Sequence, residues 1–527
     1  MDRNLLHAHL EQQKRLFKTA NDRKGQFYQK KFTRTELNLL FHSGGQPSKA
    51  YGLRQTVVGY AYPPCILPLA SLTSMIIDDL RLETHHRGRV LVVRAFGYPA
   101  KWQAVQNAVE DSVGGVERLA VYNFDPTQEG PQVLPKGGLF AIKEPYCKMT
   151  GDGMTTIRVD HPTDLVRLEE SDEIVPIELQ PRLVEPCMTP AAALKENGNT
   201  AFKVENYHDA EYQYSRALKV CGEQDTLLTA DIYRNRAIVN LYLARHEAAL
   251  VDAEKAIVTE PTYLKKLDLP KTNGKAYYRA GCAAYHIQDF EKARACFNKV
   301  KEIDPSDVDA DRELNRTNAR LLEQLQGRYD FEAMAKAVSK KRQRLDHASH
   351  TAKITIRDTS DRGRGLFSTI NIKAGELVFC EKAFSMAYDD GEAGNCSVIL
   401  NLGQDSISMG TQATRLVDTI HKLLHSPKQA TEFLKLYDGE YSPKTSVLAE
   451  NGLVALDTFR VQAILEYNGF GCPSTMSSEN TDDKSGGPTG VWVMASYANH
   501  DCVGSVSRAF IGDVMVVYAM RDIEKGE

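Results

Sequence analysis

The chain has 527 residues, of which 42% are hydrophobic and 25% are charged, and its formal net charge is -4. These ordinary globular values exclude a wholly disordered chain, and the length suggests about three or four domains at roughly 100–200 residues each. The charge balance excludes a globally basic nucleic-acid-binding protein. Because no apolar run approaches the ~18 residues that span a bilayer, and the N-terminus lacks a signal-peptide core, we expect an intracellular chain, cytoplasmic or nuclear, without membrane contact.

Ten cysteines are spread along the chain, and no two of them lie within four residues of each other. A zinc half-site of the CxxC type is therefore absent, and we expect no metal site. In an intracellular protein we expect these cysteines to be reduced thiols, several of them buried.

Residues 1–55 are predicted to form a basic arm. Eleven Lys or Arg stand against four Asp or Glu in residues 1–54, and the stretch is polar, rather helical, and ends in a turn-like segment at residues 44–48. One interpretation is a solvated arm or helix, which is the ordinary role of a charge run. The other is an electrostatic contact with nucleic acid or with an acidic protein.

Residues 56–185 are rich in short β-type segments that are separated by turn signals such as Gly151-Asp152-Gly153. Strands are predicted at residues 89–94, 119–124, 138–143 and 155–159. Their order and spacing suggest a small barrel and resemble an OB-fold, which binds oligonucleotides or acts as an interaction module. Because aromatic and basic residues do not interleave here, we favour the interaction or structural role and expect no nucleic-acid partner.

Residues 190–335 carry three helical repeats, in which small and aromatic residues fall at matching offsets, so that two antiparallel helices approach closely. The positions are Gly198, Phe202, Tyr207, Ala210, Tyr214 and Ala217, then Tyr233, Ala237, Ala249, Ala256 and Pro261, then Tyr277, Gly281, Phe290, Ala293, Phe297 and Pro305. The pattern resembles the tetratricopeptide repeat, which builds an all-α superhelix whose groove typically holds an extended peptide. The spacing between the last two prolines exceeds the usual ~34 residues, so residues 262–274 are expected to lengthen a helix or a loop.

A polar set falls on the first helices of these repeats, which line the concave surface. Lys195 and Asn199 are four residues apart, as are Lys275 and Arg279, so each pair shares one helix face, and Asn235 lies on the first helix of the second repeat. Cations and amides of this kind suit a peptide's terminal carboxylate and an adjacent acidic side chain. The set resembles the carboxylate clamp of tetratricopeptide co-chaperones, which implies binding to the C-terminal Glu-Glu-Val-Asp tails of 70 and 90 kDa heat-shock chaperones. The alternative is a set of solvated helix positions.

The remaining chain, residues 351–527, becomes β-rich again and contains two sequence motifs. The motifs are Arg362-Gly363-Arg364-Gly365-Leu366 in the first segment and Asn499-His500-Asp501-Cys502 in the second, followed by a hairpin with a Gly512-Asp513 turn and the ending Asp522-Ile523-Glu524-Lys525-Gly526-Glu527. Glycines permit a tight turn and a close approach of the backbone to a ligand. In this order the motifs resemble the SET domain of protein lysine methyltransferases, interrupted by an insertion at about residues 385–489.

The insertion is similar to that of the split SET domains in SET-and-MYND methyltransferases, although the paired cysteines of a MYND module are missing. The order of repeats before SET resembles fungal tetratricopeptide-plus-SET proteins. The resemblance implies transfer of a methyl group from S-adenosylmethionine to a lysine of a protein substrate, by in-line displacement that needs positioning and desolvation. The cofactor-binding residues that it implies are Arg362, Gly363, Arg364, Gly365, Asn468, Asn499 and His500.

The sequence departs from the family pattern at two places. Asp501, Gly504 and Ser505 replace residues of a normally rigid turn, so we expect a looser turn and an added charge near the cofactor. The chain as given ends at Glu527, before the segment whose tyrosine closes the lysine channel in the family, so we expect a C-terminally incomplete SET domain with no identified catalytic residue. We therefore expect weak cofactor binding and poor methyl transfer, and a non-catalytic adaptor or co-chaperone is the alternative to an active methyltransferase. A nucleic-acid factor that uses the barrel and the arm is the weakest interpretation.

Overall fold

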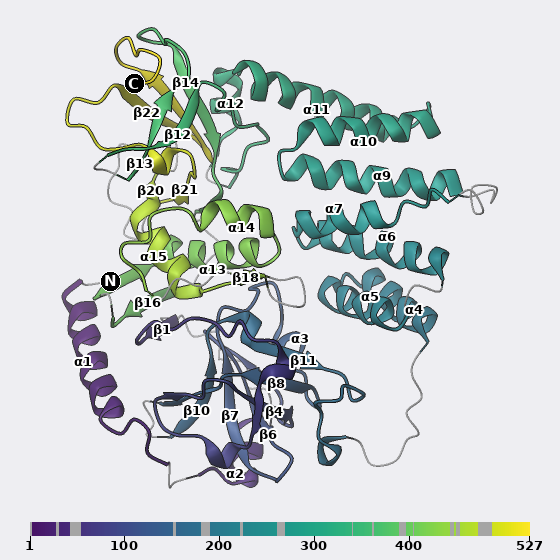
Figure 1. Cartoon of the computed structure of the whole chain (residues 1–527), viewed down its shortest axis with the longest axis vertical. Helices are drawn as coiled ribbons and strands as arrows, with labels where there is room; N and C mark the ends of the chain where they lie inside the picture. The colour runs from purple at the N-terminus through teal and green to yellow at the C-terminus, as the bar shows by residue number, and fades with distance from the viewer. Residues whose placement is uncertain are drawn as a thin grey trace.

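The structure of the protein is a computed structural model. It describes residues 3–27, 31–42, 54–150, 154–180, 190–221, 225–260, 269–339, 341–360, 363–388, 397–403, 405–442, 447–448, 454–472 and 487–527. A β-rich N-terminal unit, a helical repeat unit and a β-rich C-terminal unit follow one another along the chain (Figure 1). The predicted multidomain α+β fold class is confirmed. Among the described helices, none combines the length and the apolar character that crossing a membrane would require.

The N-terminal unit is one strongly curved sheet. Its strands are β2 (Thr73–Met75), β3 (Thr84–His85), β4 (Arg89–Ala95), β5 (Ala100–Lys101), β6 (Val105–Glu110), β7 (Val116–Val121), β8 (Leu139–Lys143), β9 (Tyr146–Met149), β10 (Thr155–Val159) and β11 (Leu165–Leu168), with the short helix α3 (Gly130–Val133) between β7 and β8. The run β4-β6-β7-β10 is flanked by β8 at one end and β9 at the other. Only Glu144 and Pro145 separate β8 from β9 in the chain, so the two ends of the run come together as in a small barrel.

The repeat unit is a stack of helices beside the other two units (Figure 1). Its described helices are α4 (Ala191–Lys203), α5 (Tyr207–Cys221), α6 (Thr226–Tyr242), α7 (His246–Lys255), α9 (Leu269–His286), α10 (Phe290–Ile303) and α11 (Val308–Gln326). The short helix α12 (Phe331–Ala337) follows, and its Met334 packs against the C-terminal unit. The predicted pairing of small and aromatic residues is present. A Cβ atom on Gly198 would lie 2.5 Å from the Tyr214 ring, and one on Gly281 would lie 2.7 Å from the Phe297 ring. These glycines therefore allow α4 to pack on α5 and α9 on α10.

Of the segment that was expected to lengthen a helix or a loop, residues 262–274, the first part, 262–268, lies outside the described residues. The remainder, residues 269–274, forms the first turns of α9, which is 18 residues long. The described part of the extra sequence therefore extends the first helix of the third repeat.

Three small sheets and an insertion form the C-terminal unit. The sheets are β12 (Ile354–Asp358) with β13 (Arg364–Ser368), β14 (Leu377–Lys382) with β23 (Val514–Ala519) and β22 (Val506–Ile511), and β15 (Ser385–Ala387) with β21 (Thr489–Val491) and β20 (Gly469–Gly471). The insertion contains β16 (Ser397–Asn401), β17 (Ser406–Met409), α13 (Thr411–Leu424), α14 (Pro427–Phe433), β18 (Val447–Leu448), β19 (Val454–Ala455) and α15 (Thr458–Asn468). The predicted hairpin is present as β22 and β23, and Gly512 takes a positive φ of 58° at its turn.

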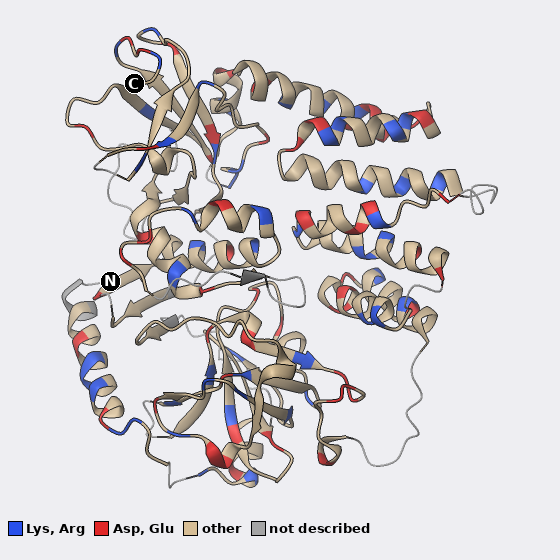
Figure 2. Cartoon of the chain, in the orientation of Figure 1, with Lys and Arg blue, Asp and Glu red and all other residues tan. Residues whose placement is uncertain are grey.

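The N-terminal arm packs against this insertion. Its helix α1 (Arg3–Asn21) buries Leu10 completely in a cluster with Val398 and Leu400 of β16, and Lys14 pairs with Asp405 at 2.6 Å. After α2 (Arg34–Leu40), strand β1 (Arg54–Val58) pairs in parallel with β16. Figure 2 shows basic and acidic segments together on α1. The arm is thus not simply solvated, because Leu10 of α1 packs against β16 and strand β1 pairs with β16.

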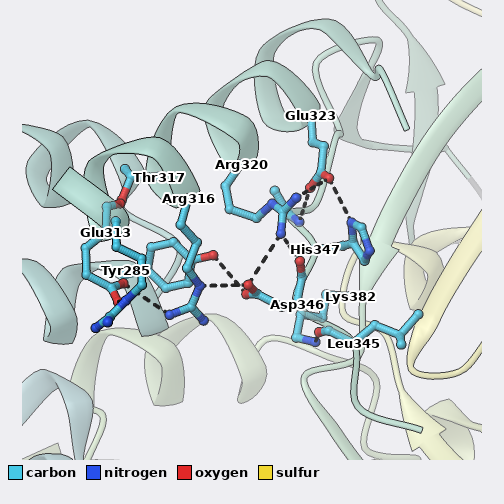
Figure 3. A network of polar contacts seen from close by, with 12 residues as sticks. Tyr285, Glu313, Arg316, Thr317, Arg320, Glu323, Leu345, Asp346, His347 and Lys382 are labelled. Carbon is cyan, nitrogen blue, oxygen red and sulfur yellow. Dashed lines mark hydrogen bonds and ion pairs between the residues drawn. The ribbon is translucent and has the colours of Figure 1, made fainter. Parts of the chain in front are cut away.

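An irregular linker, residues 341–350, joins the repeats to the C-terminal unit and is held by polar contacts (Figure 3). The Asp346 carboxylate accepts hydrogen bonds from the Tyr285 hydroxyl at 2.8 Å and from Arg316 Nε at 2.7 Å. Glu323 of α11 accepts from the backbone N–H of Ala348 at 2.8 Å and contacts His347 Nδ1 at 2.7 Å. The linker is therefore fixed to α9 and α11.

The opposite side of the same linker is fixed to the β22–β23 hairpin. Asp513 accepts from the backbone N–H of Leu345 at 2.8 Å and pairs with Lys382 at 2.6 Å. The backbone N–H of Asp513 donates to the carbonyl of Gln343 at 2.8 Å. Because the linker is bonded on both sides, the repeat unit and the C-terminal unit hold a defined relative position.

Candidate functional site

A cavity of about 860 Å³ opens in the C-terminal unit, where several short strands end. Its volume lies in the range of small-molecule and cofactor sites. The lining residues are Ile354, Leu366, Phe367, Ser368, Ile372, Val378, Phe379, Tyr467, Asn468, Phe470, Ala495, Ser496, Ala498 to Asp501, Gly504 to Arg508, Met515, Val517, Ile523 and Glu527. The two segments that carried the sequence motifs therefore meet at one cavity.

Three of the residues predicted to bind the cofactor border this cavity: Asn468, Asn499 and His500. Asn468 is buried at the end of α15, and its Nδ2 donates to the carbonyl oxygens of Tyr437 and Ile464, both at 2.7 Å. These two bonds fix the amide before any ligand binds. Asn499 and His500 are exposed on the cavity wall, where their polar atoms can meet a ligand.

The glycine-rich turn lies beside the cavity. Gly363 has a positive φ of 69°, and its carbonyl accepts from the backbone N–H of Thr359 at 2.6 Å, which closes a tight turn before β13. A Cβ atom on Gly365 would lie 2.7 Å from Asn499 Nδ2. The absence of a side chain at Gly365 therefore leaves room for Asn499 of the second segment. Asn499 lines the cavity and Gly365 contacts Asn499, so Gly365 influences the cavity only indirectly. Arg362 lies outside the described residues.

Arg364, which the resemblance implied as a cofactor-binding residue, uses its side chain to contact neighbouring elements. Its guanidinium lies 5.0 Å from the ring centre of Tyr497, donates to the Tyr497 hydroxyl at 3.4 Å, and donates to the carbonyl of Lys435. It thus links β13 to the end of α14 and to the short helix η5 (Ala495–Tyr497) that leads into Asn499. The structure assigns to Arg364 a positioning role next to the cavity.

A buried carboxylate that sequence reasoning missed supports the same wall. Glu381 of β14 is 6% exposed, and it accepts the backbone N–H groups of Met494 at 2.8 Å and Ala495 at 2.9 Å. Burial raises the pKa of Glu381 to about 7. The available signal was one acidic residue that follows four apolar residues in the strand Leu377–Lys382.

The turn after Asn499 is more restrained than expected. The Asp501 carboxylate accepts the backbone N–H of Val503 at 3.1 Å, while the Ser505 hydroxyl accepts from Arg521 at 2.7 Å and the Ser505 carbonyl accepts from the backbone N–H of Met520 at 2.8 Å. The replacements that suggested a loose turn therefore supply bonds of their own.

A second polar site lies on the first helices of the repeats. Asn199 of α4 accepts from the Tyr214 hydroxyl at 2.7 Å and from Asn235 Nδ2 at 3.0 Å, which joins α4 to α6. Arg279 of α9 is half-buried and donates to the carbonyl of Arg234 on α6. The structure therefore brings Asn199, Asn235 and Arg279 onto one connected surface. Lys195 is half-buried on α4, and Lys275 is exposed one turn before Arg279.

This surface carries more positive than negative charge. Burial and the nearby Arg234 cation lower the pKa of Arg279 to about 10, and no carboxylate pairs with Arg279 within the described part of the chain. Asp231 pairs with Arg234 and lies 3.8 Å from Lys195, while Glu196 accepts from Asn199 Nδ2 at 2.9 Å. Two carboxylates of the protein thus occupy donors that the clamp prediction gives to a peptide.

No group of three or more His, Cys, Asp or Glu side chains with metal-binding geometry occurs among the residues that the structure describes.

Comparisons with known proteins identify the families of the two units that contain these sites. Residues 363–527 match the family model of the SET domain, and residues 274–307 match that of the tetratricopeptide repeat. A protein of Gibberella zeae named "Methyltransferase" is 31% identical over 501 residues, which are 92% of this chain and 67% of that protein. The Hsp70/Hsp90 co-chaperone cns1 of Schizosaccharomyces pombe is 29% identical over 118 residues, which are 22% of this chain and 30% of that protein.

Among solved structures, the first repeat domain of Spaghetti (RPAP3) bound to the HSP90 peptide SRMEEVD is 27% identical. The match covers 25% of this chain and 94% of that chain, with a TM-score of 0.21.

The raised pKa of Glu381 predicts a pH-dependent effect of Glu381→Gln. The pKa of Glu381 in the folded state, about 7, lies above its ordinary value of 4.5. Between these two pH values the carboxyl is protonated in the folded protein but ionised in the unfolded chain, so the free energy of unfolding falls as pH rises from about 4.5 to 7. The free energy of unfolding of Glu381→Gln, relative to that of the wild type, should therefore rise by up to about 3 kcal/mol between pH 5 and pH 8. Urea unfolding at the two pH values measures this difference, and exposed Glu376→Gln is the control. Parallel pH profiles of Glu381→Gln and wild type would contradict the assignment.

Proposed function

This chain belongs to the family of fungal proteins that combine tetratricopeptide repeats with a SET domain, and we propose that it is an S-adenosylmethionine-dependent protein lysine methyltransferase. We propose in addition that its repeats bind acidic C-terminal peptides, such as those of 70 and 90 kDa heat-shock chaperones. The chain spans 67% of its fungal methyltransferase relative and 30% of cns1, so the activity and partners of the whole protein are part of this proposal. A cytoplasmic or nuclear location is part of it as well.

The observation that carries the enzymatic proposal is the cavity bordered by Asn468, Asn499 and His500. Its volume of about 860 Å³ accommodates a nucleoside-sized cofactor. Gly365 of the first motif and Asn499 of the second are in close contact, since a Cβ atom on Gly365 would lie 2.7 Å from Asn499 Nδ2. When bound, S-adenosylmethionine supplies a methyl group on a positively charged sulfur.

The residues of the chain would bind, orient and desolvate. Asn468, fixed by its two backbone bonds, and Asn499 and His500 on the exposed wall provide polar groups for the cofactor. Apolar residues of the wall, such as Phe470 and Val517, exclude water. An apolar environment lowers the pKa of a lysine amine and so favours the neutral form that can accept a methyl group.

A second candidate function is that of an adaptor or co-chaperone without catalysis. Two observations favour it: the connected polar surface on α4, α6 and α9, and the likeness of the repeats to cns1, which is named an Hsp70/Hsp90 co-chaperone. The two functions differ in one measurable respect, because only the enzyme requires an intact cofactor cavity.

Asn499→Ala tests the enzymatic proposal. We expect the wild-type chain to bind S-adenosylmethionine and the variant to bind at least tenfold more weakly, since a charge-assisted or well-oriented polar contact is worth roughly 1.5–3 kcal/mol. Calorimetric titration measures the binding. Tritium transfer from labelled cofactor to a panel of histones and lysate proteins then tests catalysis.

The matched control is Asn298→Ala on the exposed face of α10, which should bind the cofactor as the wild type does. Equal affinity of Asn499→Ala and wild type would place the cofactor elsewhere. Cofactor binding without any transfer would favour the adaptor function for this chain.

Arg279→Ala and Lys195→Ala test the peptide proposal. Lys195, Asn199 and Asn235 would bind the terminal carboxylate, and Lys275 and Arg279 the next acidic side chain. Each substitution should weaken the binding of a Met-Glu-Glu-Val-Asp peptide by about tenfold to a hundredfold, because charge-assisted bonds are worth roughly 1.5–3 kcal/mol each. Amidation of the peptide C-terminus should weaken binding at least as much. Calorimetry of the full chain measures these affinities, with Arg294→Ala on α10 as the control.

If the peptide and its amide bind equally, or if neither binds at millimolar concentration, the clamp prediction is wrong. The five residues would then be a solvated surface.

Asp231→Asn should strengthen peptide binding. The Asp231 carboxylate pairs with Arg234 and lies near Lys195, so an incoming acidic peptide must compete with it. Asp231 is 41% exposed, and removal of its charge should raise the affinity by about two- to fivefold, in keeping with the roughly 0.2–1 kcal/mol of exposed ion pairs. The control is Glu291→Gln, which removes a similar i,i+3 pair from the outer helix α10. Unchanged or weaker binding in Asp231→Asn would show that Asp231 supports the site instead of competing for it.

A further inference from the structure

A second, smaller cavity of about 300 Å³ lies next to the large one in the C-terminal unit. Residues of β17, α13, α15 and β20 surround it, and Phe470 borders both cavities. No residue predicted from the sequence motifs lines it. The cavity is at the lower end of the size range of ligand sites, so it suits a small molecule or one side chain of a bound partner.

Arg415 of α13 borders this cavity and is only 6% exposed. Two of its nitrogens donate to the carbonyl oxygens of Gly490 and Leu465, both at 3.1 Å. Its Nε has no hydrogen-bond partner. Backbone carbonyls satisfy hydrogen bonds but do not neutralise the charge, and no carboxylate of the described residues forms an ion pair with this buried guanidinium. Buried charges are ordinarily paired.

A second unpartnered group lies on the same wall. The hydroxyl of Thr489, one residue before the carbonyl that Arg415 binds, is buried and has no hydrogen-bond partner. Buried polar groups are rarely left unbonded, because each costs the free energy of its desolvation. The guanidinium Nε and the hydroxyl, which both lack a hydrogen-bond partner and belong to residues that line one cavity, together offer donors that suit a carboxylate ligand.

The Glu466 carboxylate, which lines the same cavity, limits which second group a ligand can carry there. This carboxylate accepts from the Ser406 hydroxyl at 3.0 Å and from Gln462 at 3.3 Å. A second carboxylate of the ligand would be repelled there, whereas a neutral or positively charged group would be attracted.

We propose that this cavity is a binding site for a carboxylate group, held by Arg415 and Thr489, in a ligand whose other end is neutral or cationic. Such a carboxylate can belong to a free amino acid or to an acidic side chain of a protein bound next to the large cavity. The recognition chemistry is the same in both cases. The proposal concerns binding alone and stands whether or not the chain transfers methyl groups.

The test uses the full chain and two pairs of probes. The first pair is 4-aminobutyrate and its amide, and the second is acetyl-Ala-Lys-Ala-Glu-Ala-amide and the same peptide with Gln in place of Glu. Calorimetric titration should show at least tenfold weaker binding of the member that lacks the carboxylate. Preference within the first pair only identifies a free amino acid as the ligand, and preference within the second pair only identifies a protein side chain.

Thr489→Val is the decisive variant, because the hydroxyl that it removes has no partner in the protein and its loss should not lower the thermal midpoint. It should nevertheless weaken binding of the carboxylate probes by about tenfold, and Arg415→Gln should abolish binding. Thr163→Val is the matched control, since Thr163 is likewise buried without a partner but lies in the N-terminal unit. Carboxylate and amide probes that bind equally, carboxylate probes that bind Thr489→Val as they bind wild type, or no binding at millimolar concentration would each overturn the proposal.

Discussion

The geometry of the whole molecule depends on the bonding of one irregular segment, the linker of residues 341–350. Asp346 is held by α9 and α11 on one side, and Leu345 is held by Asp513 of the β22–β23 hairpin on the other. The Asp346 carboxylate is 44% exposed, so its ion pair with Arg316 contributes little free energy. Asp513 is 5% exposed and bonds both the linker and Lys382, so this side of the linker is fixed more firmly. Under the proposed function, a peptide bound by the repeats would be presented at a defined distance and direction from the large cavity.

Local patterns in the sequence predicted the parts of the fold that local packing determines. Gly198 opposite Tyr214 and Gly281 opposite Phe297 repeat at a fixed spacing, and the strands at residues 89–94 and 155–159 have strong β-type composition. Glu381 could not be predicted as a support of residues 494–495, because a single acidic residue in a strand carries no periodic signal. The parallel pairing of β1 with β16 was also missed, since nothing in either strand identifies a partner more than 300 residues away. Contacts of this kind are determined by the assembled units.

The repeat surface and the small cavity each contain an arginine with which no carboxylate of the described residues forms an ion pair. Arg279 has a pKa lowered to about 10 by burial and by Arg234, and burial lowers the pKa of Arg415 to about 10 as well. An unpaired buried cation lowers the stability of the empty protein, and a bound anion restores the lost interaction. Arg279 and Arg415 thus lower the stability of the empty protein and at the same time raise its affinity for negatively charged groups. Functional residues commonly reduce stability in this way.

The pairing of β1 with β16 has a consequence for synthesis on the ribosome. The five residues of β1 leave the ribosome long before those of β16, since more than 300 residues separate the two strands. At about 5–20 residues per second, the first strand waits roughly 20–70 s for its partner. During that interval its backbone hydrogen-bonding groups have no strand to pair with, and a sheet edge of this kind is a site of mispairing between chains. Neighbouring nascent chains on one messenger RNA could therefore pair their β1 strands with one another, whereas in the complete chain one side of β1 is paired with β16.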